Sequence, residues 1–176
     1  VLKYEPVSAA IESARLQMQA GSKVVFLTPQ GRRLNQAVAQ EMSALPGMIL
    51  VCGRYEGVDE RLLEAHADDE LSIGDYVISG GELGALIVVD AVLRLLPGVL
   101  GDAASAEQDS FSSGLLDCPH YTRPELVDNR PVPPELLNGN HAEIRRWRLK
   151  QSLGRTWVRR PDLLTGRALT EEEQQL

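Results

Sequence analysis

The chain has few cysteines and few histidines, which limits the metal chemistry that it can support. Its two cysteines, Cys52 and Cys118, are too few to form a structural zinc site without other ligands. The histidines, His66, His120 and His141, do not follow a metal-binding spacing, and Cys118 with His120 supplies at most two ligands. We therefore predict no resident metal site and, from the cysteine usage, a cytoplasmic protein.

Long apolar runs and two familiar nucleotide-binding motifs are also missing. No apolar run approaches the roughly 20 residues that a membrane-spanning helix needs, so we expect no membrane partner. The motifs G-x-G-x-x-G and G-x-x-x-x-G-K-[ST] are absent, which weakens a Rossmann or P-loop assignment. We predict no signal peptide; the sequence begins at Val1, without an initiator methionine, in a lead-in to a helix, and we expect further sequence ahead of it.

The charge is acidic overall but uneven. The 18 basic and 25 acidic residues give a net charge of −7, which taken alone argues against nucleic-acid binding. Residues 141–160, however, hold seven basic residues and one acid, Glu143, so this segment carries +6 and the remainder about −13. A basic end on an acidic body is a charge asymmetry typical of a protein with a polyanionic partner.

Strands and helices alternate over residues 1–97, which predicts an α/β fold with a mostly parallel sheet. The continuous apolar run in residues 23–28 is typical of a parallel strand covered by helices on both faces. The predicted strands are 23–28, 48–52, 70–73 and 76–78, and the predicted helices are 6–15, 35–45, 59–64 and 82–96.

The sequence changes character after Pro97. Residues 98–114 are rich in Gly, Ala, Ser and Asp, which predicts a long mobile linker, and residues 119–134 continue irregularly with five prolines. A helix is then predicted over residues 140–158, where Asn140 and Glu143 match a capping box, and Thr170 with Glu173 starts a last helix in the same way. The carboxyl third is therefore predicted to be a small helical module.

Three apolar runs end abruptly in polar or glycine-rich loops, at residues 26–31, 50–57 and 71–82. Loops at strand ends are where α/β proteins bind small molecules, so we predict one pocket walled by these three loops. Single glycines usually serve turns, but the later two loops share five of them: Gly53, Gly57, Gly74, Gly80 and Gly81. Exposed backbone amides and carbonyls there are suited to the edge of a purine.

Two charged residues near the linker are candidates for catalysis. Asp90 and Arg94 lie four residues apart on the apolar helix and could form an ordinary ion pair, yet Arg94 is in the last turn, where its guanidinium can reach a ligand. Asp109 is either a solvated acid or a base delivered by a mobile loop.

The basic helix is either a solvated surface or a site for RNA. Arg145, Arg148 and Arg155 fall on roughly one side of it, and Trp147 and Trp157 interleave with the arginines. Guanidinium groups next to indoles suit phosphates and unstacked bases, and the chain offers no obvious groove-reading helix, so we favour RNA.

At this point the sequence resembles a known family. Five blocks carry the resemblance, in order along almost the whole chain: LVCGRYEGVDER at 50–61, SIGDYVISGGE at 72–82, PGVLG at 97–101, LDCPHYTRP at 116–124 and GNHAEIRRW at 139–147. They are similar to the bacterial tRNA (guanine-N1)-methyltransferases of the TrmD type, in the SPOUT superfamily. The resemblance implies a deep trefoil knot in the α/β domain and a homodimer with the active site at the subunit interface.

The resemblance also implies an activity and its residues. A methyl group would pass from S-adenosylmethionine to N1 of the tRNA guanine on the 3′ side of the anticodon, with Asp109 of the partner protomer and Arg94 catalytic, and Mg²⁺ near Glu56 as an aid. The implied domains are 1–100 for the cofactor, 101–124 as a flexible linker and 125–176 for tRNA, contacted by Arg145, Arg146, Arg148 and Arg155. The implied cofactor residues are Leu27, Thr28, Pro29, Gly53, Tyr55, Glu56, Ser72, Ile73, Gly74, Asp75, Tyr76, Val77, Ile78, Gly80 and Gly81.

The chain departs from the family pattern in two places, and two other functions stay open. The family's opening strand, expected ahead of Val1, is not part of this sequence, and Gly84 stands where proline is expected. A non-catalytic RNA-binding relative would bind tRNA without consuming cofactor, although the presence of both Arg94 and Asp109 weighs against it. A Rossmann-type oxidoreductase is the weaker alternative, because its glycine motif is absent.

Overall fold

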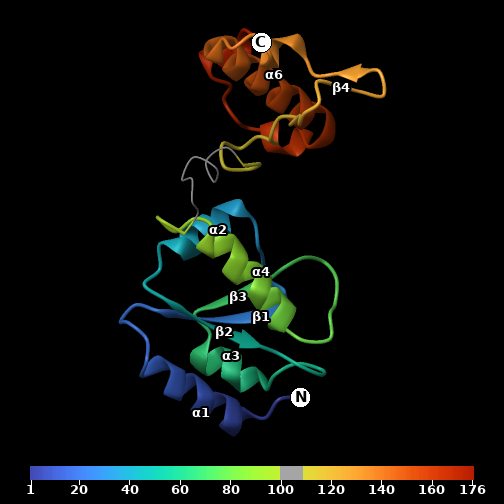
Figure 1. Cartoon of the computed structure of the whole chain (residues 1–176). Coiled ribbons are helices and arrows are strands. Elements are labelled where there is room, and N and C mark those ends of the chain that lie inside the picture. The colour runs from blue at the N-terminus through green and yellow to red at the C-terminus, as the bar shows by residue number, and fades with distance from the viewer. Residues whose placement is uncertain (100–108) are drawn as a thin grey trace. The chain divides into compact units, whose positions relative to one another are not determined.

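The computed structural model describes residues 1–99 and 109–176. The chain divides into two compact units, Val1–Gly101 and Asp102–Leu176 (Figure 1). Each unit has its own helices and its own small sheet, and each is described separately below. Within the described residues, no helix is both long and apolar enough to cross a membrane.

The first unit is built on a three-stranded parallel sheet in the order β2-β1-β3. Its strands are β1 (Lys23–Arg33), β2 (Met48–Cys52) and β3 (Asp69–Ser72). Residues Val24, Val25 and Phe26 of the central strand are no more than 2% exposed. The predicted mostly parallel sheet is thus confirmed.

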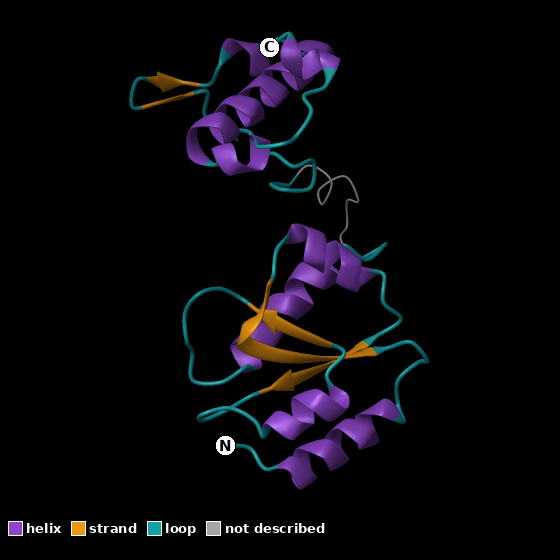
Figure 2. Ribbon diagram, turned by 180° about the vertical axis from the view of Figure 1, so that it is seen from behind, coloured by secondary structure: helices purple, strands orange, loops and turns teal. Residues whose placement is uncertain are grey.

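Helices cover both faces of this sheet (Figure 2). On one face Val25 packs with residues of α2 (Gln36–Ser43) and α4 (Glu82–Leu93), and on the other Val24 and Phe26 pack with α1 (Tyr4–Arg15) and α3 (Glu60–His66). Successive residues of a strand point to opposite faces, which is why the uninterrupted apolar run serves two cores.

The side-chain caps follow from the sequence. Asn35 Oδ1 accepts from Val38 N at 3.0 Å to begin α2, and Asp59 Oδ1 accepts from Arg61 N at 3.1 Å to begin α3. Both side chains satisfy backbone donors that the first turn leaves unpaired. Helices α2 and α4 end two or three residues earlier than predicted, because the chain turns before the Pro46 and Pro97 that served as end markers.

Two strand predictions were wrong. Strand β1 continues to Arg33 rather than ending at residue 28, and it pairs with β3 in two registers: Leu27 and then Arg32 both face Leu71. Residues 76–78 are a loop, because Gly74, at φ +147°, turns the chain and Tyr76 N bonds back to Gly74 O at 3.0 Å. The apolar side chains of 76–78 stay exposed or half-exposed instead of joining the sheet.

The second unit is organised around α6 (His141–Arg159), with η1 (Pro134–Leu136), η2 (Pro161–Leu164) and α7 (Glu171–Gln174). Asn140 caps α6, but Glu143 makes no reciprocal capping bond and accepts from Asn138 instead, whereas the predicted capping box of Thr170 and Glu173 is confirmed. The region predicted as irregular holds a hairpin of β4 (Leu126–Val127) and β5 (Arg130–Pro131). Asp128 and Asn129 turn it, at φ +49° and +58°, as two-residue hairpin loops require.

The predicted linker, 101–124, falls partly outside the described residues, since 100–108 are not among them. The described part of this segment, residues 109–124, packs on the second unit and is hydrogen-bonded to it. Leu115 and Cys118 are 3% and 5% exposed, and Leu116 N donates to Thr156 Oγ1 of α6 at 2.9 Å.

Candidate functional site

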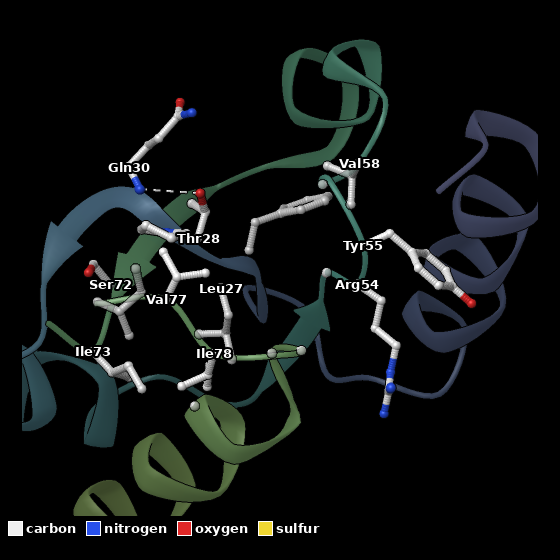
Figure 3. Close-up of a pocket in the computed structure, with 18 of the residues that line it drawn as sticks. Leu27, Thr28, Gln30, Arg54, Tyr55, Val58, Ser72, Ile73, Val77 and Ile78 are labelled. Carbon is white, nitrogen blue, oxygen red and sulfur yellow. Dashed lines mark hydrogen bonds between the residues drawn. The ribbon is translucent and has the colours of Figure 1, made fainter. Parts of the chain in front are cut away.

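A cavity of about 440 Å³ lies in the first unit where the parallel strands end (Figure 3). Three chain segments wall it: residues 26–30 of β1, residues 53–58 after β2, and residues 71–81 at and after β3. This is the edge of a parallel sheet at which α/β proteins bind ligands, and the volume suits a drug-sized molecule. The predicted three-loop pocket is therefore present.

The residues predicted for the cofactor gather at this cavity, with one exception. Asp75 is outside the lining, because its side chain is 80% exposed and its carboxylate pairs with Arg33. Lining residues inside the three predicted loops, but not named for the cofactor, are Phe26, Gln30, Arg54, Gly57, Leu71 and Ser79; the prediction missed Val58, Glu60, Leu63 and Gly84 altogether. Position next to a predicted loop was the signal that could have found most of them.

The first wall exists because β1 bulges. Between Leu27 and Arg32 the pairing with β3 slips, so Thr28, Pro29 and Gln30 are displaced from the ladder toward the cavity. Gln30 N donates to Thr28 Oγ1 at 3.3 Å (Figure 3). The chain returns at Gly31, where a Cβ atom would lie 2.4 Å from the backbone of Glu70, so this crossing admits only glycine.

The second and third walls are joined directly. Gly81 N donates to Gly53 O at 2.9 Å, and Arg54 Nε donates to Glu82 Oε1 at 2.7 Å. A Cβ atom on Gly81 would lie 2.8 Å from Cys52 Cα, so the absence of a side chain permits this approach. A hydrogen bond at its own backbone and then the Arg54 guanidinium hold the pKa of the Glu82 carboxyl below its usual value.

The third wall combines a rigid turn with apolar side chains. Ser72 Oγ donates to Gly74 O at 3.1 Å and accepts from Gly74 N at 3.2 Å, and the Tyr76 hydroxyl donates to Ile73 O at 3.4 Å. Figure 3 shows Leu27, Ile73 and Ile78 toward α4, with Tyr55 and Arg54 on the opposite side. The cavity thus offers an apolar patch, peptide groups exposed at glycine turns, and the carboxylates of Glu56 and Glu60 at its lining.

The two predicted catalytic residues belong to different units. Arg94 caps the C-terminus of α4, with its backbone N–H donating to Asp90 O at 3.2 Å. Asp109 opens the second described part, and its carbonyl accepts from Ser112 N at 3.3 Å. How the two side chains meet therefore stays a prediction.

Only some of the arginines that were predicted to bind RNA are exposed and unshared on the basic helix α6. Arg145 pairs with Glu172 at 3.2 Å and Arg146 reaches Gln175 O at 3.5 Å, so α7 uses some of their capacity. Trp157 is 72% exposed, and Arg148 is also exposed, while Arg155 is partly buried.

The two tryptophans differ in role. The Trp147 ring lies 6.3 Å from the Tyr121 ring, and the residue is only partly exposed, so it packs within the unit. Of the two indoles, Trp157 is the one whose face is open to a base.

A third donor, missed in the sequence, joins the cysteine–histidine pair of the second unit. Asp117, Cys118 and His120 place one ligand atom each within 4.8 Å of one another. However, Asp117 Oδ1 already accepts from Cys118 N at 2.6 Å, Oδ2 lies 2.7 Å from His120 Nε2, and burial raises the pKa of the Cys118 thiol. These contacts satisfy the group internally and disfavour the thiolate that a metal needs.

Comparison with known proteins places these features in a family. The family described as tRNA (Guanine-1)-methyltransferase TrmD matches residues 1–166. A tRNA (guanine-N(1)-)-methyltransferase of Serratia proteamaculans is 61% identical over 98% of this chain and 68% of its own length. Proteins of the same name from Methylococcus capsulatus and Salmonella paratyphi A are 62% and 60% identical over the whole chain, which spans 70% and 69% of them.

The matched region takes in all three walls of the cavity, Arg94, Asp109 and the basic helix. High identity over nearly the whole chain leaves the two alternative assignments without support. The chain belongs to the tRNA (guanine-1)-methyltransferase TrmD family.

Proposed function

We propose that the protein is an S-adenosylmethionine-dependent tRNA methyltransferase that acts on N1 of the guanine on the 3′ side of the anticodon. The observation that carries the proposal is the three-walled cavity in a chain about 60% identical to tRNA (guanine-N(1)-)-methyltransferases. Membership of the family makes the protein a methyltransferase, and the cavity is where its methyl donor would bind.

The cavity fits S-adenosylmethionine in chemistry and size. Gly81 N and Gly53 O bond each other and Gly81 O accepts from Ala85 N, so the edge of an adenine would bond other peptide groups of the lining, such as Gly53 N and those at Gly80. Leu27, Ile73 and Ile78 offer apolar contact for its face. Bound there, S-adenosylmethionine supplies an electrophilic methyl group on sulfur. A divalent cation such as Mg²⁺ would suit the carboxylate of Glu56, since it prefers oxygen ligands.

Asp109 and Arg94 would act on the guanine, one by removing a proton and the other by stabilising negative charge. Guanine N1 carries a proton and becomes nucleophilic only when that proton leaves, so Asp109 acts as the general base. Negative charge then moves onto the guanine carbonyl oxygen, where the Arg94 guanidinium stabilises it. The target base must leave its stack to reach the cavity. Arg148 and Arg155, with Arg145 and Arg146, hold the phosphates of the tRNA.

The same proposal includes a homodimer with the active site at the subunit interface. Its support is helix α4, whose Leu83, Leu86, Ile87 and Leu93 are between 43% and 64% exposed. They recur at helical spacing and form one apolar face, which a soluble protein would cover with a partner. In the dimer Asp109 of one protomer would serve the cavity of the other.

We also propose the knotted arrangement and the division of labour along the chain. A deep trefoil knot in the first unit is in keeping with the close approach of residues 71–81 to residues 52–54, where Gly81 meets Cys52 and Gly53. Residues 1–100 would bind the cofactor and 125–176 would bind tRNA as a small helical domain, to which the later part of the predicted linker is attached through Leu116 and Thr156.

Methyl transfer from labelled S-adenosylmethionine to a tRNA transcript tests the proposal. We expect label in a transcript with guanine beside the anticodon and none when adenine replaces that base. Asp109→Asn should abolish transfer while leaving cofactor affinity nearly unchanged, because the base is lost and the cavity is not. Binding of tRNA without any transfer by the unaltered protein would instead favour a non-catalytic relative.

A further inference from the structure

The residue proposed as the base sits at the start of a compact turn that the chain closes on itself. Phe111 N donates to Leu115 O at 2.7 Å, and Gly114 N donates to Phe111 O at 3.1 Å. Asp117 N donates to Ser110 Oγ at 2.9 Å, which ties the residue next to Asp109 to the end of the turn. Phe111 has φ +75°, a conformation that a bulky residue keeps only where its surroundings enforce it.

One hydroxyl fastens this turn to the basic helix. Thr156, in the last turns of α6, is completely buried. Its Oγ1 accepts from Leu116 N at 2.9 Å and donates to Ser152 O at 2.7 Å, so both hydrogen-bonding capacities are used. The Arg160 guanidinium lies 5.8 Å from the centre of the Phe111 ring and adds a second contact between the helix end and the turn.

Threonine at this buried helix position lowers stability unless its hydroxyl makes hydrogen bonds. It is a poorer helix former than most residues, and a buried hydroxyl requires partners on both sides. A valine would fill the same volume and keep the helix, but it would leave Leu116 N–H without this acceptor. The property that threonine adds is therefore the bond to the turn.

We propose that Thr156 is a positioning residue for methyl transfer. Its hydroxyl fixes the turn of residues 109–118 to the helix that carries Arg148 and Arg155, so that the Asp109 backbone and the tRNA-binding surface form one rigid piece. Docking of tRNA on α6 would then bring the base to guanine N1 in a set geometry. The inference rests on the proposed function, because it assigns Asp109 the role of base.

Thr156→Val and Thr156→Ser separate positioning from packing. The valine variant keeps the volume and loses the bond, whereas the serine variant keeps the bond and loses a methyl group. The measurements are the single-turnover rate of methyl transfer at saturating tRNA and S-adenosylmethionine, the KM for tRNA and the thermal midpoint. Misplacing a reacting group lowers rate more than affinity, so we expect about a tenfold fall in rate for Thr156→Val, with KM within about twofold. Thr156→Ser should stay within about twofold of the unaltered protein in both.

Three outcomes would overturn the proposal. These are an unchanged rate in Thr156→Val, an equal loss in both variants, or a rise in KM as large as the fall in rate. If Thr156→Val does not fold, Ser110→Ala provides the second test, because it removes the Ser110 Oγ that accepts from Asp117 N and closes the turn. We expect Ser110→Ala to lower the rate of methyl transfer and Ser110→Thr to restore it. Absence of transfer in the unaltered protein would refute the proposed function itself, which is a distinct result.

Discussion

At the residue scale, the cavity depends on places where a side chain would not fit. Gly31 and Gly81 lie against the backbone of β3 and β2, and a Cβ atom at either would come within 2.8 Å of a main-chain atom. Glycine at such a crossing is required by close packing rather than by turn conformation, since neither has a positive φ. The sequence identified Gly81 as part of a loop, but not the strand that it meets.

Alanine at Gly81 should therefore destabilise the first unit, while alanine at Gly84 should not. In Gly81→Ala the new methyl group meets Cys52 Cα, and overpacking of this kind costs about 1–3 kcal/mol. At Gly84, inside α4, the nearest atom would be Leu27 Cδ1 at an ordinary 3.5 Å, so the gain in helix propensity of about 0.5–1 kcal/mol dominates. Urea unfolding followed by far-ultraviolet circular dichroism measures both. Equal stabilities for the two variants would contradict the close approach.

At the element scale, the final helix is held by a nearly buried ion pair. Glu173 is 6% exposed; its carboxylate accepts from Arg167 at 2.7 and 3.0 Å and from Thr170 N at 2.8 Å. The Arg167 hydrogen bonds in particular hold the pKa of the Glu173 carboxyl below its usual value. A helix of four residues has little stability of its own, so these bonds are what keep α7 in place.

Glu173→Gln should lower the free energy of unfolding of the second unit by about 1–3 kcal/mol at pH 7, because Arg167 loses its charged partner. Since the folded pKa is depressed, the stabilisation is present above the unfolded pKa of about 4.3 and is lost as pH falls through the folded value. The gap between variant and unaltered protein should thus close in acid. Urea titrations at pH 7 and at pH 3 measure it. Glu171→Gln, on the exposed side of α7, is the matched control and should be neutral; a gap independent of pH would rule out the ion pair as its source.

Helix α4 presents the face on which the proposed homodimer would depend. Leu86→Glu places a charge at the centre of that face, where Leu86 is 64% exposed. Burying an unpaired carboxylate in an interface is strongly unfavourable. We therefore expect the dissociation constant of the dimer to rise by about tenfold or more. Sedimentation velocity over a concentration series measures this. Leu16→Glu is the control, because Leu16 is 89% exposed at the end of α1 and should leave the assembly unchanged.

The secondary structure could be predicted where apolar patterning and local capping decide it. Strands β2 and β3 and the major helices follow from buried runs and from caps at Asn35 and Asp59. The extension of β1 could not be predicted, because it depends on how β1 slips past β3 after the sheet has formed. The loop at 76–78 comes from the turn at Gly74, which the apolar pattern of these residues did not reveal. The pocket segments were predictable as strand ends, whereas the Arg54–Glu82 bridge joins residues 28 positions apart and has no local signal.

At the scale of the whole molecule, both tryptophans of the chain lie in α6, in the second unit. Tryptophan fluorescence therefore reports that unit, while circular dichroism reports both. S-adenosylmethionine at one hundred times its Kd should stabilise the unit that binds it by about 2.7 kcal/mol. We expect the circular dichroism transition of the first unit to move upward in temperature and the fluorescence transition to stay in place. A shift of fluorescence alone would move the cofactor site to the other unit.

The glycine-lined wall has a practical consequence. A compound made to occupy the cavity would meet the backbone of the glycine-lined walls at Gly53, Gly80 and Gly81, which a change of side chain elsewhere does not alter. A substitution of Gly81 that blocked such a compound would also force β2 and the third wall apart, because the new Cβ atom would meet Cys52 Cα. A change at this glycine that excludes a ligand should therefore also destabilise the first unit.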